Sequence, residues 1–210
     1  MRKVSSKCKQ CRREGAKLFL KGERCKSAKC AMIKKNYKPG VHGPKRAMTK
    51  LSAYGKQLRE KQKAKRIYGM LEAQFYNLAK KAMKNKKDAG KTMLALLEKR
   101  FDNVIYRLKL APSRIAARQL ISHSQFTING RTVNIASYTT KLGDQIKVKE
   151  TKSKSKYWEK IKEAIKNEKD IPTWLALDNK NLTAQITAEP NVEDVANFID
   201  SSLIIGFYSR

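Results

Sequence analysis

The chain has 210 residues, of which 48 are lysine or arginine and 18 are aspartate or glutamate, a formal net charge of +30. This length suffices for one or two domains with apolar cores, and so large a positive excess calls for a polyanionic partner. The sequence shows no long apolar run and no N-terminal apolar stretch of a secretory signal. The composition therefore argues against a membrane protein and favours a cytosolic protein that binds nucleic acid.

Positive charge is concentrated toward the N-terminal end of the chain. Residues 1–50 carry 17 basic and 2 acidic side chains, whereas residues 151–210 carry 9 of each. Residues 170–210 hold 6 acidic and 2 basic side chains, so this end is mildly negative. We therefore expect nucleic acid to contact the earlier segments and other proteins to contact the last one.

The first 47 residues predict loops and short turns, and they contain all four cysteines. Cys8-x-x-Cys11 and Cys25-x-x-x-x-Cys30 are two close pairs separated by thirteen residues. Two such pairs suit the tetrahedral coordination of Zn²⁺, and the neighbouring lysines and arginines favour thiolate. The spacing predicts one structural zinc ion, which would hold together an arm with little apolar content.

Other states of the four thiols remain open. Reduced, metal-free cysteines or a redox-active Cys-x-x-Cys would also fit the pattern, although the βαβ context typical of redox motifs is not predicted. Disulfides conflict with a reducing compartment. A site closed by four thiolates would leave no coordination position for catalysis.

Two helices are expected between residues 48 and 92. Leu51, Tyr54 and Leu58 share one face of the first. Beyond Leu58 the apolar stripe stops and the helix is basic almost all round, which favours phosphate over a protein core as its contact. Apolar residues from 71 to 82 predict the second helix.

Residues 93–150 change from helical to strand periodicity. Apolar residues over 92–108 predict one continuous helix, and Ser113 is suited to cap a shorter helix that ends near residue 122. Asn129-Gly130 between alternating apolar residues is a strong hairpin signal. A further strand is expected near residues 146–148.

The predicted helix at 113–122 has an arginine face. Arg114, Arg118 and Ser122 lie on one side of it, and Arg107 lies one turn from the end of the preceding helix. Guanidinium groups bind phosphate oxygens in a bidentate fashion. An ordinary solvated basic face is the alternative, but the basic charge of the segment and the adjoining hairpin turn favour phosphate binding.

The last quarter of the chain predicts mixed structure. After a joint rich in lysine and serine at 150–156, we expect a helix around 158–165, two strands about a polar turn at 174–187 and a helix at 192–199. The apolar stretch at 202–209 predicts a buried strand or a docked tail.

The candidate catalytic motifs in the sequence are incomplete. "AGKT" at 89–92 resembles part of a phosphate-binding loop, but Asn85 stands where that loop requires glycine. His42 and His123 are the two histidines, and neither has the serine, cysteine and carboxylate partners that a triad needs. We therefore predict that the protein is not an enzyme.

Several blocks closely resemble the bacterial ribosomal protein S-four family. They are "CRREGAKLFLKGERC" at 11–25, "PGVHG" at 39–43, "YGKQLREKQKAKRIYG" at 54–69, "RFDNVIYRL" at 100–108, "SRIAARQLI" at 113–121, "INGRTVNIASY" at 128–138 and "FYSR" at 207–210. The resemblance covers essentially the whole chain. Members with the four-cysteine arm bind zinc, and Cys8, Cys11, Cys25 and Cys30 all match it.

The resemblance implies an α+β fold in four parts. These are a zinc-stapled basic arm at 1–47, a helical rRNA-binding domain at 48–92, and the small RNA-binding domain named after the family at 93–150, with two helices, a hairpin and a further strand. A mixed α/β C-terminal part at 151–210 would pack on the preceding domains. The family often has glycine where this chain has Lys109 and Ser124, which puts the turn before the hairpin in question.

The resemblance also implies a function. Members are structural constituents of the small ribosomal subunit in the cytoplasm, act as monomers within the ribosome, bind the 5′ domain of small-subunit rRNA and nucleate assembly. They contact ribosomal protein S-five, here expected through the C-terminal region, at an interface linked to translational accuracy. They lie near the mRNA entry path, and some repress their own message.

Residues expected to contact RNA are basic or polar and lie in the first three segments. They are Arg12, Arg13, Lys17, Lys21, Arg24, His42, Lys56, Arg59, Lys61, Lys63, Lys65, Arg66, Arg107, Ser113, Arg114, Arg118, Ser122, His123, Asn129, Gly130 and Arg131.

Two other classes of protein fit this sequence less well. An RNA-modifying enzyme would need a further catalytic domain, for which the chain has no room. A zinc-dependent DNA-binding regulator would need a recognition helix within the metal module, and residues 12–24 are weakly helical.

Overall fold

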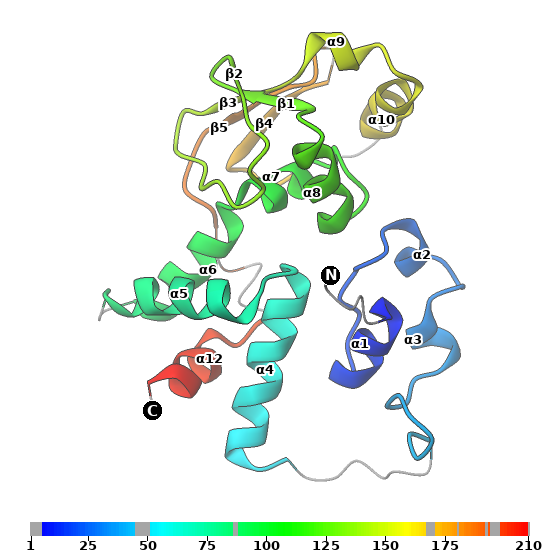
Figure 1. Cartoon of the computed structure of the whole chain (residues 1–210), viewed down its shortest axis with the longest axis vertical. Helices are drawn as coiled ribbons and strands as arrows, with labels where there is room; N and C mark the ends of the chain where they lie inside the picture. The colour runs from blue at the N-terminus through cyan, green and yellow to red at the C-terminus, as the bar shows by residue number, and fades with distance from the viewer. Residues whose placement is uncertain are drawn as a thin grey trace. The chain divides into compact units, whose positions relative to one another are not determined.

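A computed structural model describes residues 6–44, 51–85, 88–166, 171–179, 181–191, 193 and 198–209. The chain forms two compact units, residues 1–93 with 194–210 and residues 94–193 (Figure 1). These units differ from the predicted domains, because the C-terminal segment belongs with the N-terminal unit. In the part of the chain that is described, no helix is both long and apolar enough to span a bilayer.

Short helices form the N-terminal arm within residues 6–44. They are α1 (Lys7–Glu14), α2 (Glu23–Lys26) and α3 (Ala31–Lys34). The prediction of loops and turns alone is wrong for α1, which ends at Gly15 with a left-handed φ of +70°, as helices commonly do at glycine. The buried apolar side chains of the arm are Leu18, Leu20 and three cysteines, so its core is small.

Longer helices complete the first unit. They are α4 (Ala53–Ile67), α5 (Glu72–Met83), the first half of α6 (Ala89–Glu98) and α12 (Ser201–Tyr208). The Ser52 hydroxyl caps α4 by accepting a hydrogen bond from the Gly55 N–H at 3.1 Å. The final apolar stretch is thus a helix, and it packs along α4 and α5 (Figure 1). Most of the helix expected at 192–199 lies outside the described residues.

The second half of α4 has a buried face, contrary to the prediction that the apolar stripe stops beyond Leu58 and the helix is then basic almost all round. Lys61, Ala64 and Ile67 are buried. Helix α12 packs against α4: Lys61 Nζ lies 4.4 Å from the centre of the Phe207 ring, and in the first half of α4 a Cβ added at Gly206 would lie 3.1 Å from the Gln57 side chain. The apolar stripe of α4 alone could not indicate this contact, because its partner comes from the other end of the chain.

The continuous helix predicted over 92–108 is interrupted in the structure. Helix α6 ends at Glu98, Arg100 is extended and forms a β-bridge with Thr139, and α7 (Phe101–Arg107) then begins. The Phe101 and Asp102 N–H groups donate to the Tyr138 and Ala136 carbonyls at 2.9 and 3.1 Å. Helix α8 (Arg114–Ser122) follows, and Ser113 caps it as predicted by accepting from the Ala116 N–H at 3.2 Å.

The described strands of the second unit form one antiparallel sheet. They are β1 (Phe126–Ile128), β2 (Arg131–Thr132), β3 (Gln145–Val148), β4 (Leu175–Asp178) and β5 (Thr183–Ile186), in the order β2-β1-β3-β5-β4. Ile128 pairs with Arg131 on one side and with Ile146 on the other. Asn129 and Gly130 have φ of +49° and +80°, as a tight hairpin turn requires. The strands expected near 126–128, 146–148 and 174–187 are confirmed, but β2 ends at Thr132, before the alternating apolar residues Val133 and Ile135 on which the second hairpin strand was predicted.

Helices α9 (Glu150–Ser153) and α10 (Lys156–Lys166) connect β3 to β4. The helix expected around 158–165 is therefore confirmed, and the joint before it contains one short helix. Strands β4 and β5 pair directly with β3. One sheet thus unites segments that the sequence assigned to two domains.

One face of the sheet carries the core of the second unit. Phe126 lies edge-on to Phe101 of α7 and Trp158 of α10, with ring centroids 5.9 and 5.6 Å apart. Ile121 of α8 joins the same apolar cluster. Trp174 belongs to it as well, so both tryptophans of the chain are buried here.

The two departures from the family's glycines are accommodated without loss of the fold. Lys109 and Ser124 adopt left-handed φ angles of +60° and +53°. At the end of α8, the Ser124 and Gln125 N–H groups donate to the Ile121 and Leu120 carbonyls at 2.8 and 3.2 Å. This is the pattern in which glycine usually ends a helix, so serine occupies a strained position.

Candidate nucleic-acid interface

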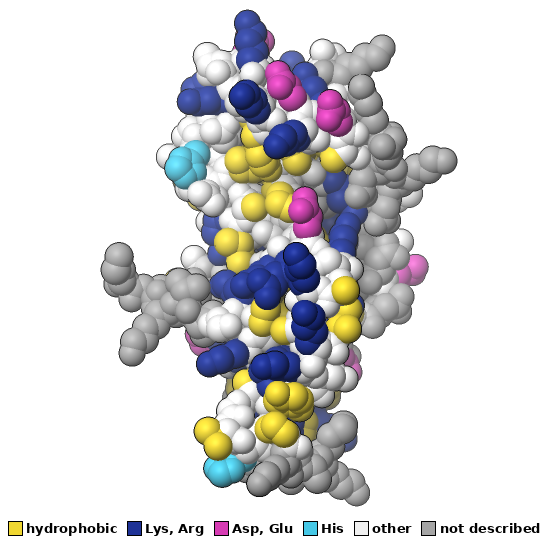
Figure 2. All heavy atoms as spheres, turned by 90° about the vertical axis from the view of Figure 1, so that its right-hand side faces the viewer, with side chains coloured by type: hydrophobic (Ala, Val, Ile, Leu, Met, Phe, Trp, Pro, Cys, Tyr) yellow, Lys and Arg dark blue, Asp and Glu magenta, His cyan; other side chains and the backbone are white. Residues whose placement is uncertain are grey.

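Lysine and arginine side chains gather over the N-terminal unit on the side of the arm (Figure 2, lower part). Of the arm residues predicted to contact RNA, Arg13, Lys21, Arg24 and His42 are exposed, whereas Arg12 and Lys17 are partly buried. The exposed side chains are available to a polyanion, and the partly buried ones also have a role within the arm.

Arg12 holds the loop that carries His42. Its Nε donates to the Tyr37 carbonyl at 2.8 Å and its Nη2 to the Lys38 carbonyl at 3.3 Å. The guanidinium carbon also lies 4.4 Å from the centre of the Tyr37 ring, a favourable cation–π distance. Arg12 therefore orders residues 37–38, just before the exposed turn that contains His42.

The four cysteines are free thiols, of which Cys11, Cys25 and Cys30 are buried. Burial raises the pKa of Cys11, and the other three thiols lie near enough to raise it further. The Lys21 N–H donates to Cys25 Sγ at 3.3 Å. Across the described ranges, no group of three or more His, Cys, Asp or Glu side chains is arranged to hold a metal ion, so the zinc site stays a prediction.

A buried carboxylate joins the arm to α4. Glu14 has a side chain that is 2% exposed, and it accepts from Arg59 Nη1 at 3.3 Å and from Arg66 Nη1. Lys63 pairs with Glu60 at 3.1 Å. Arg59 and Arg66, which were predicted to contact RNA, therefore also hold the arm to α4, whereas the Lys63 pair lies within α4.

Lys61 lies in a setting different from the one predicted. Its Nζ lies 2.6 Å from Glu72 Oε1 and 4.4 Å from the centre of the Phe207 ring, and the residue is 5% exposed. Lys65 and the Tyr208 hydroxyl also donate to Glu72. Lys61 thus connects α4, α5 and α12 and offers little surface to RNA, whereas Lys56 is exposed.

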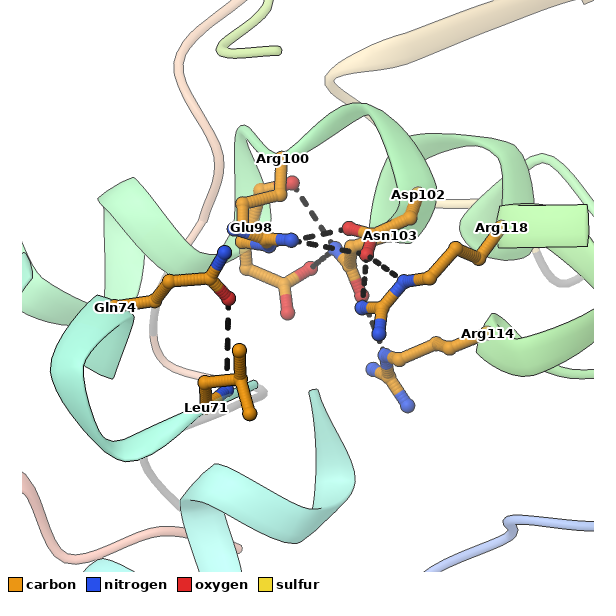
Figure 3. Close-up of polar contacts among 8 residues, drawn as sticks. All are labelled: Leu71, Gln74, Glu98, Arg100, Asp102, Asn103, Arg114 and Arg118. Atoms are coloured by element: carbon orange, nitrogen blue, oxygen red, sulfur yellow. Dashed lines mark hydrogen bonds and ion pairs between the residues drawn. The ribbon is translucent and has the colours of Figure 1, made fainter. Parts of the chain in front are cut away.

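In the second unit, Glu98 at the end of α6 and Asp102 on α7 both bind arginines, and Figure 3 shows the arginines around Asp102. Asp102 accepts from Arg100 Nε and Nη2 at 3.2 and 3.0 Å, and from Arg118 Nε at 3.1 Å. Glu98 accepts from Arg107 Nε and Nη2 at 2.8 and 3.1 Å. Both carboxylate side chains are 2% exposed.

Asn103 links the Glu98–Arg107 pair to a third arginine. Its amide nitrogen donates to the Glu98 carboxylate at 2.9 Å, and its oxygen accepts from Arg114 Nε at 2.8 Å. The Arg114 guanidinium carbon also lies 4.4 Å from the centre of the Tyr106 ring. Arg107 and Arg114 are therefore held on one network through Glu98 and Asn103, and Arg118 is held by the adjacent residue, Asp102.

The remaining predicted residues lie at the ends of α8 and at the hairpin tip. Ser122, His123, Gly130 and Arg131 are exposed. Asn129 is exposed too, and its amide binds Asp144 and the Gln145 N–H, both at 2.9 Å. Ser113 is 7% exposed and its hydroxyl caps α8. It therefore stabilises the helix and offers little surface to RNA.

Sequence reasoning missed the acidic and amide partners of these arginines. Glu14, Glu98, Asp102 and Asn103 were not singled out, although the last three interrupt or follow an otherwise apolar helical stripe. A charged residue at a core position of a helix is a signal for a buried ion pair.

Comparisons with known proteins show which family the chain resembles. Residues 2–98 match the model described as "Ribosomal protein S4/S9 N-terminal domain", and residues 99–146 match the one described as "S4 domain". "Small ribosomal subunit protein uS4" of Clostridioides difficile strain 630 is 49% identical over 209 residues, which cover 100% of this chain and 99% of the relative.

Two further relatives give the same result. The protein of that name from Caldicellulosiruptor bescii is 51% identical over 208 residues, which cover 99% of this chain and 98% of the relative. "Small ribosomal subunit protein uS4A" of Alkaliphilus metalliredigens is 48% identical over 203 residues, which cover 97% and 96%. The chain therefore belongs to the uS4 family of small ribosomal subunit proteins, the family that its sequence blocks resemble.

Proposed function

We infer that this protein is a non-catalytic structural constituent of the small ribosomal subunit, located on cytoplasmic ribosomes, and that it binds small-subunit rRNA. The observation that carries this inference is the full-length similarity to small-subunit proteins at about half identity. The net charge of +30 gives the physical basis for binding a polyanion.

We further propose that the protein binds the 5′ domain of this rRNA early and nucleates assembly. The arm, α4 and the arginines of α7 and α8 supply the phosphate contacts in this proposal. The mildly negative C-terminal region is the proposed contact for ribosomal protein S-five, and so for an effect on translational accuracy. Binding of mRNA near the entry path, and of its own message, belongs to the same proposal.

The arm is proposed to hold one structural zinc ion through Cys8, Cys11, Cys25 and Cys30. The donor set supports this, because three of the thiols are buried and the other three cysteines lie near enough to Cys11 to raise its pKa. The Lys21 N–H bound to Cys25 Sγ is the kind of donor that supports a metal-bound thiolate. Bound Zn²⁺ would offset the repulsion among the thiolates and make the arm rigid.

RNA binding is tested with the full chain and an intact small-subunit rRNA transcript. We expect the logarithm of the affinity to fall by about 0.7–0.9 per decade of salt for each phosphate contact. Reversing Arg13 and Arg24 to glutamate should weaken binding strongly, whereas reversing the exposed Lys160 of α10 should have a small effect. Equal effects would contradict the proposed interface, and footprinting on the same RNA would identify the nucleotides contacted.

Zinc binding is tested on the reduced protein by metal analysis and X-ray absorption. We expect one zinc per chain with four sulfur ligands. Nitrogen or oxygen ligands in the absorption spectrum, or a protein that folds its arm without metal, would contradict the proposal.

A further inference from the structure

Buried carboxylates lie directly behind the arginines of the second unit. In a protein that binds a polyanion, each carboxylate reduces the electrostatic attraction. Burial also imposes a desolvation cost that close pairing has to offset. Asp102 and Glu98 bear both costs, since their side chains are 2% exposed. Their positions therefore call for an explanation beyond charge.

The backbone that carries these carboxylates is fixed on both sides. The Asp102 N–H donates to the Ala136 carbonyl at 3.1 Å, and the Thr140 N–H donates to the Lys99 carbonyl at 2.9 Å. Asn103 caps the end of α6 by donating to the Glu98 carbonyl at 3.0 Å. Because the loop at 136–140 is bonded to this segment, the carboxylates are rigid anchor points.

The arginines reach from these anchors toward the surface. The side chains of Arg107 and Arg118 are 29% and 34% exposed, while each Nε is bound to a carboxylate. In Figure 3, the side chains of Arg114 and Arg118 run side by side toward Asn103 and Asp102. A bond at Nε fixes the plane of the guanidinium, because the five N–H donors form one rigid fork.

We propose that Asp102 and Glu98 are positioning residues for rRNA binding, which fix the guanidinium planes of Arg118 and Arg107 before the RNA arrives. Asn103 does the same for Arg114. An arginine that is already ordered loses less side-chain freedom on binding, so its phosphate contact is stronger. This inference rests on the proposed function, in which these arginines contact phosphate.

The sign of one substitution separates positioning from simple charge. Asp102→Asn removes a negative charge beside the RNA surface, so electrostatics alone would tighten binding. Positioning predicts the opposite result, because Arg118 and Arg100 lose their ionised partner. Glu163→Gln is the matched control, since it makes the same change of charge at an exposed site on α10.

The experiment measures the affinity of the full chain for the rRNA transcript across a range of salt concentrations. We expect Asp102→Asn to bind about tenfold more weakly, the loss of roughly one charge-assisted contact. Its salt dependence should be shallower by about 0.7–0.9. Glu163→Gln should bind as tightly as the unaltered protein or slightly more tightly. A loss of stability alone would lower the binding-competent fraction, measured by stoichiometric titration, and would leave the salt dependence unchanged.

Further variants keep the proposal testable. If Asp102→Asn does not fold, as judged by tryptophan emission from the second unit, Glu98→Gln makes the same prediction through Arg107. Asp102→Asn that binds as tightly as the unaltered protein overturns the positioning role. If Arg118→Gln weakens binding while Asp102→Asn does not, the positioning role is contradicted and the proposed phosphate contact of Arg118 still holds. If Arg114→Gln and Arg118→Gln both leave binding unchanged, the proposed phosphate contacts fail as well.

Discussion

The arm and the second unit both carry basic side chains, but they obtain their order in different ways. In the arm, the buried apolar positions are few and three of them are cysteines. In the second unit, an apolar cluster with Phe101, Phe126 and Trp158 joins α7, α8, α10 and the sheet. The first arrangement depends on thiol chemistry in our proposal, and the second depends on burial of apolar surface.

This difference bears on how a highly charged surface stays in place. Like charges repel, so a basic surface needs an attachment strong enough to oppose that repulsion. The second unit combines an apolar core with buried carboxylates. The arm combines its cysteines with one buried carboxylate, Glu14, that binds two arginines of α4. Removing either kind of attachment should damage one region and spare the other.

Zinc removal is expected to have the largest effect and to be confined to the arm. Structural zinc contributes about 10–16 kcal/mol of apparent binding free energy in small metal-dependent modules. A strong chelator, or Cys11→Ser, should therefore abolish hydrogen-exchange protection at the arm amides, including that of Lys21. Tryptophan emission should stay unchanged, because both tryptophans lie in the second unit. An arm that keeps its protection without metal would remove the distinction between the two regions.

Phe126→Ala is expected to have the converse effect. Its ring is fully buried between Phe101 and Trp158, and its loss should destabilise the second unit by about 3–5 kcal/mol. Denaturant unfolding followed by tryptophan emission measures this change. Phe19→Ala in the arm, where the residue is 39% exposed, should leave that transition where it was. A comparable shift for both variants would mean that the two regions share one cooperative core.

A smaller change in the opposite direction is expected from Ser124→Gly. Serine holds a left-handed φ of +53° at the end of α8, and glycine relieves that strain, so the second unit should gain about 1 kcal/mol. Ser122→Gly, two residues earlier and within the helix, should instead destabilise it by about 0.5–1 kcal/mol. The same tryptophan-detected transition compares the two variants, and equal signs would contradict the assigned strain.

Local signals in the sequence predicted much of this fold. The Asn129-Gly130 turn, the Ser113 cap and the strands about 146–148 and 174–187 each depend on neighbouring residues. The break at Arg100 could not be predicted in this way, because it depends on hydrogen bonds to carbonyls near residue 138. The docking of α12 on α4 likewise joins segments far apart in the chain.

In the candidate site, too, local features were predictable from the sequence and tertiary contacts were not. Exposed basic residues such as Arg13 and Arg24 follow from composition and local pattern. The partners of Arg59, Arg107 and Arg118 do not, because Glu14, Glu98 and Asp102 reach them through tertiary packing. Sequence periodicity therefore identified the arginines but could not show which atoms hold them.

Lowering the pH should weaken the attachment of α12 through Glu72 and leave the apolar core of the second unit unaffected. This is the smallest of the four effects expected in this comparison. Burial alone raises the pKa of Glu72, but hydrogen bonds from Lys61, Lys65 and Tyr208 outweigh it and lower the pKa to about 2, from an ordinary value of 4.5. A carboxyl whose pKa is lowered by folding stabilises the folded state above its unfolded pKa. This contribution is lost as the pH falls from about 4.5 to about 2.

The measurement compares the unaltered protein with Glu72→Gln by hydrogen exchange of the α12 amides across that pH range. The side chain of Glu72 is 47% exposed, so solvent screening limits the difference in free energy of opening to about 1 kcal/mol or less. We expect that difference to be constant above about pH 5 and to vanish near pH 2. Glu23→Gln, at an exposed position in the arm, should leave α12 unaffected. A difference that persists at pH 2 would mean that Glu72 holds α12 through packing and not through its charge. The attachment of this helix would then not differ in kind from the apolar core of the second unit.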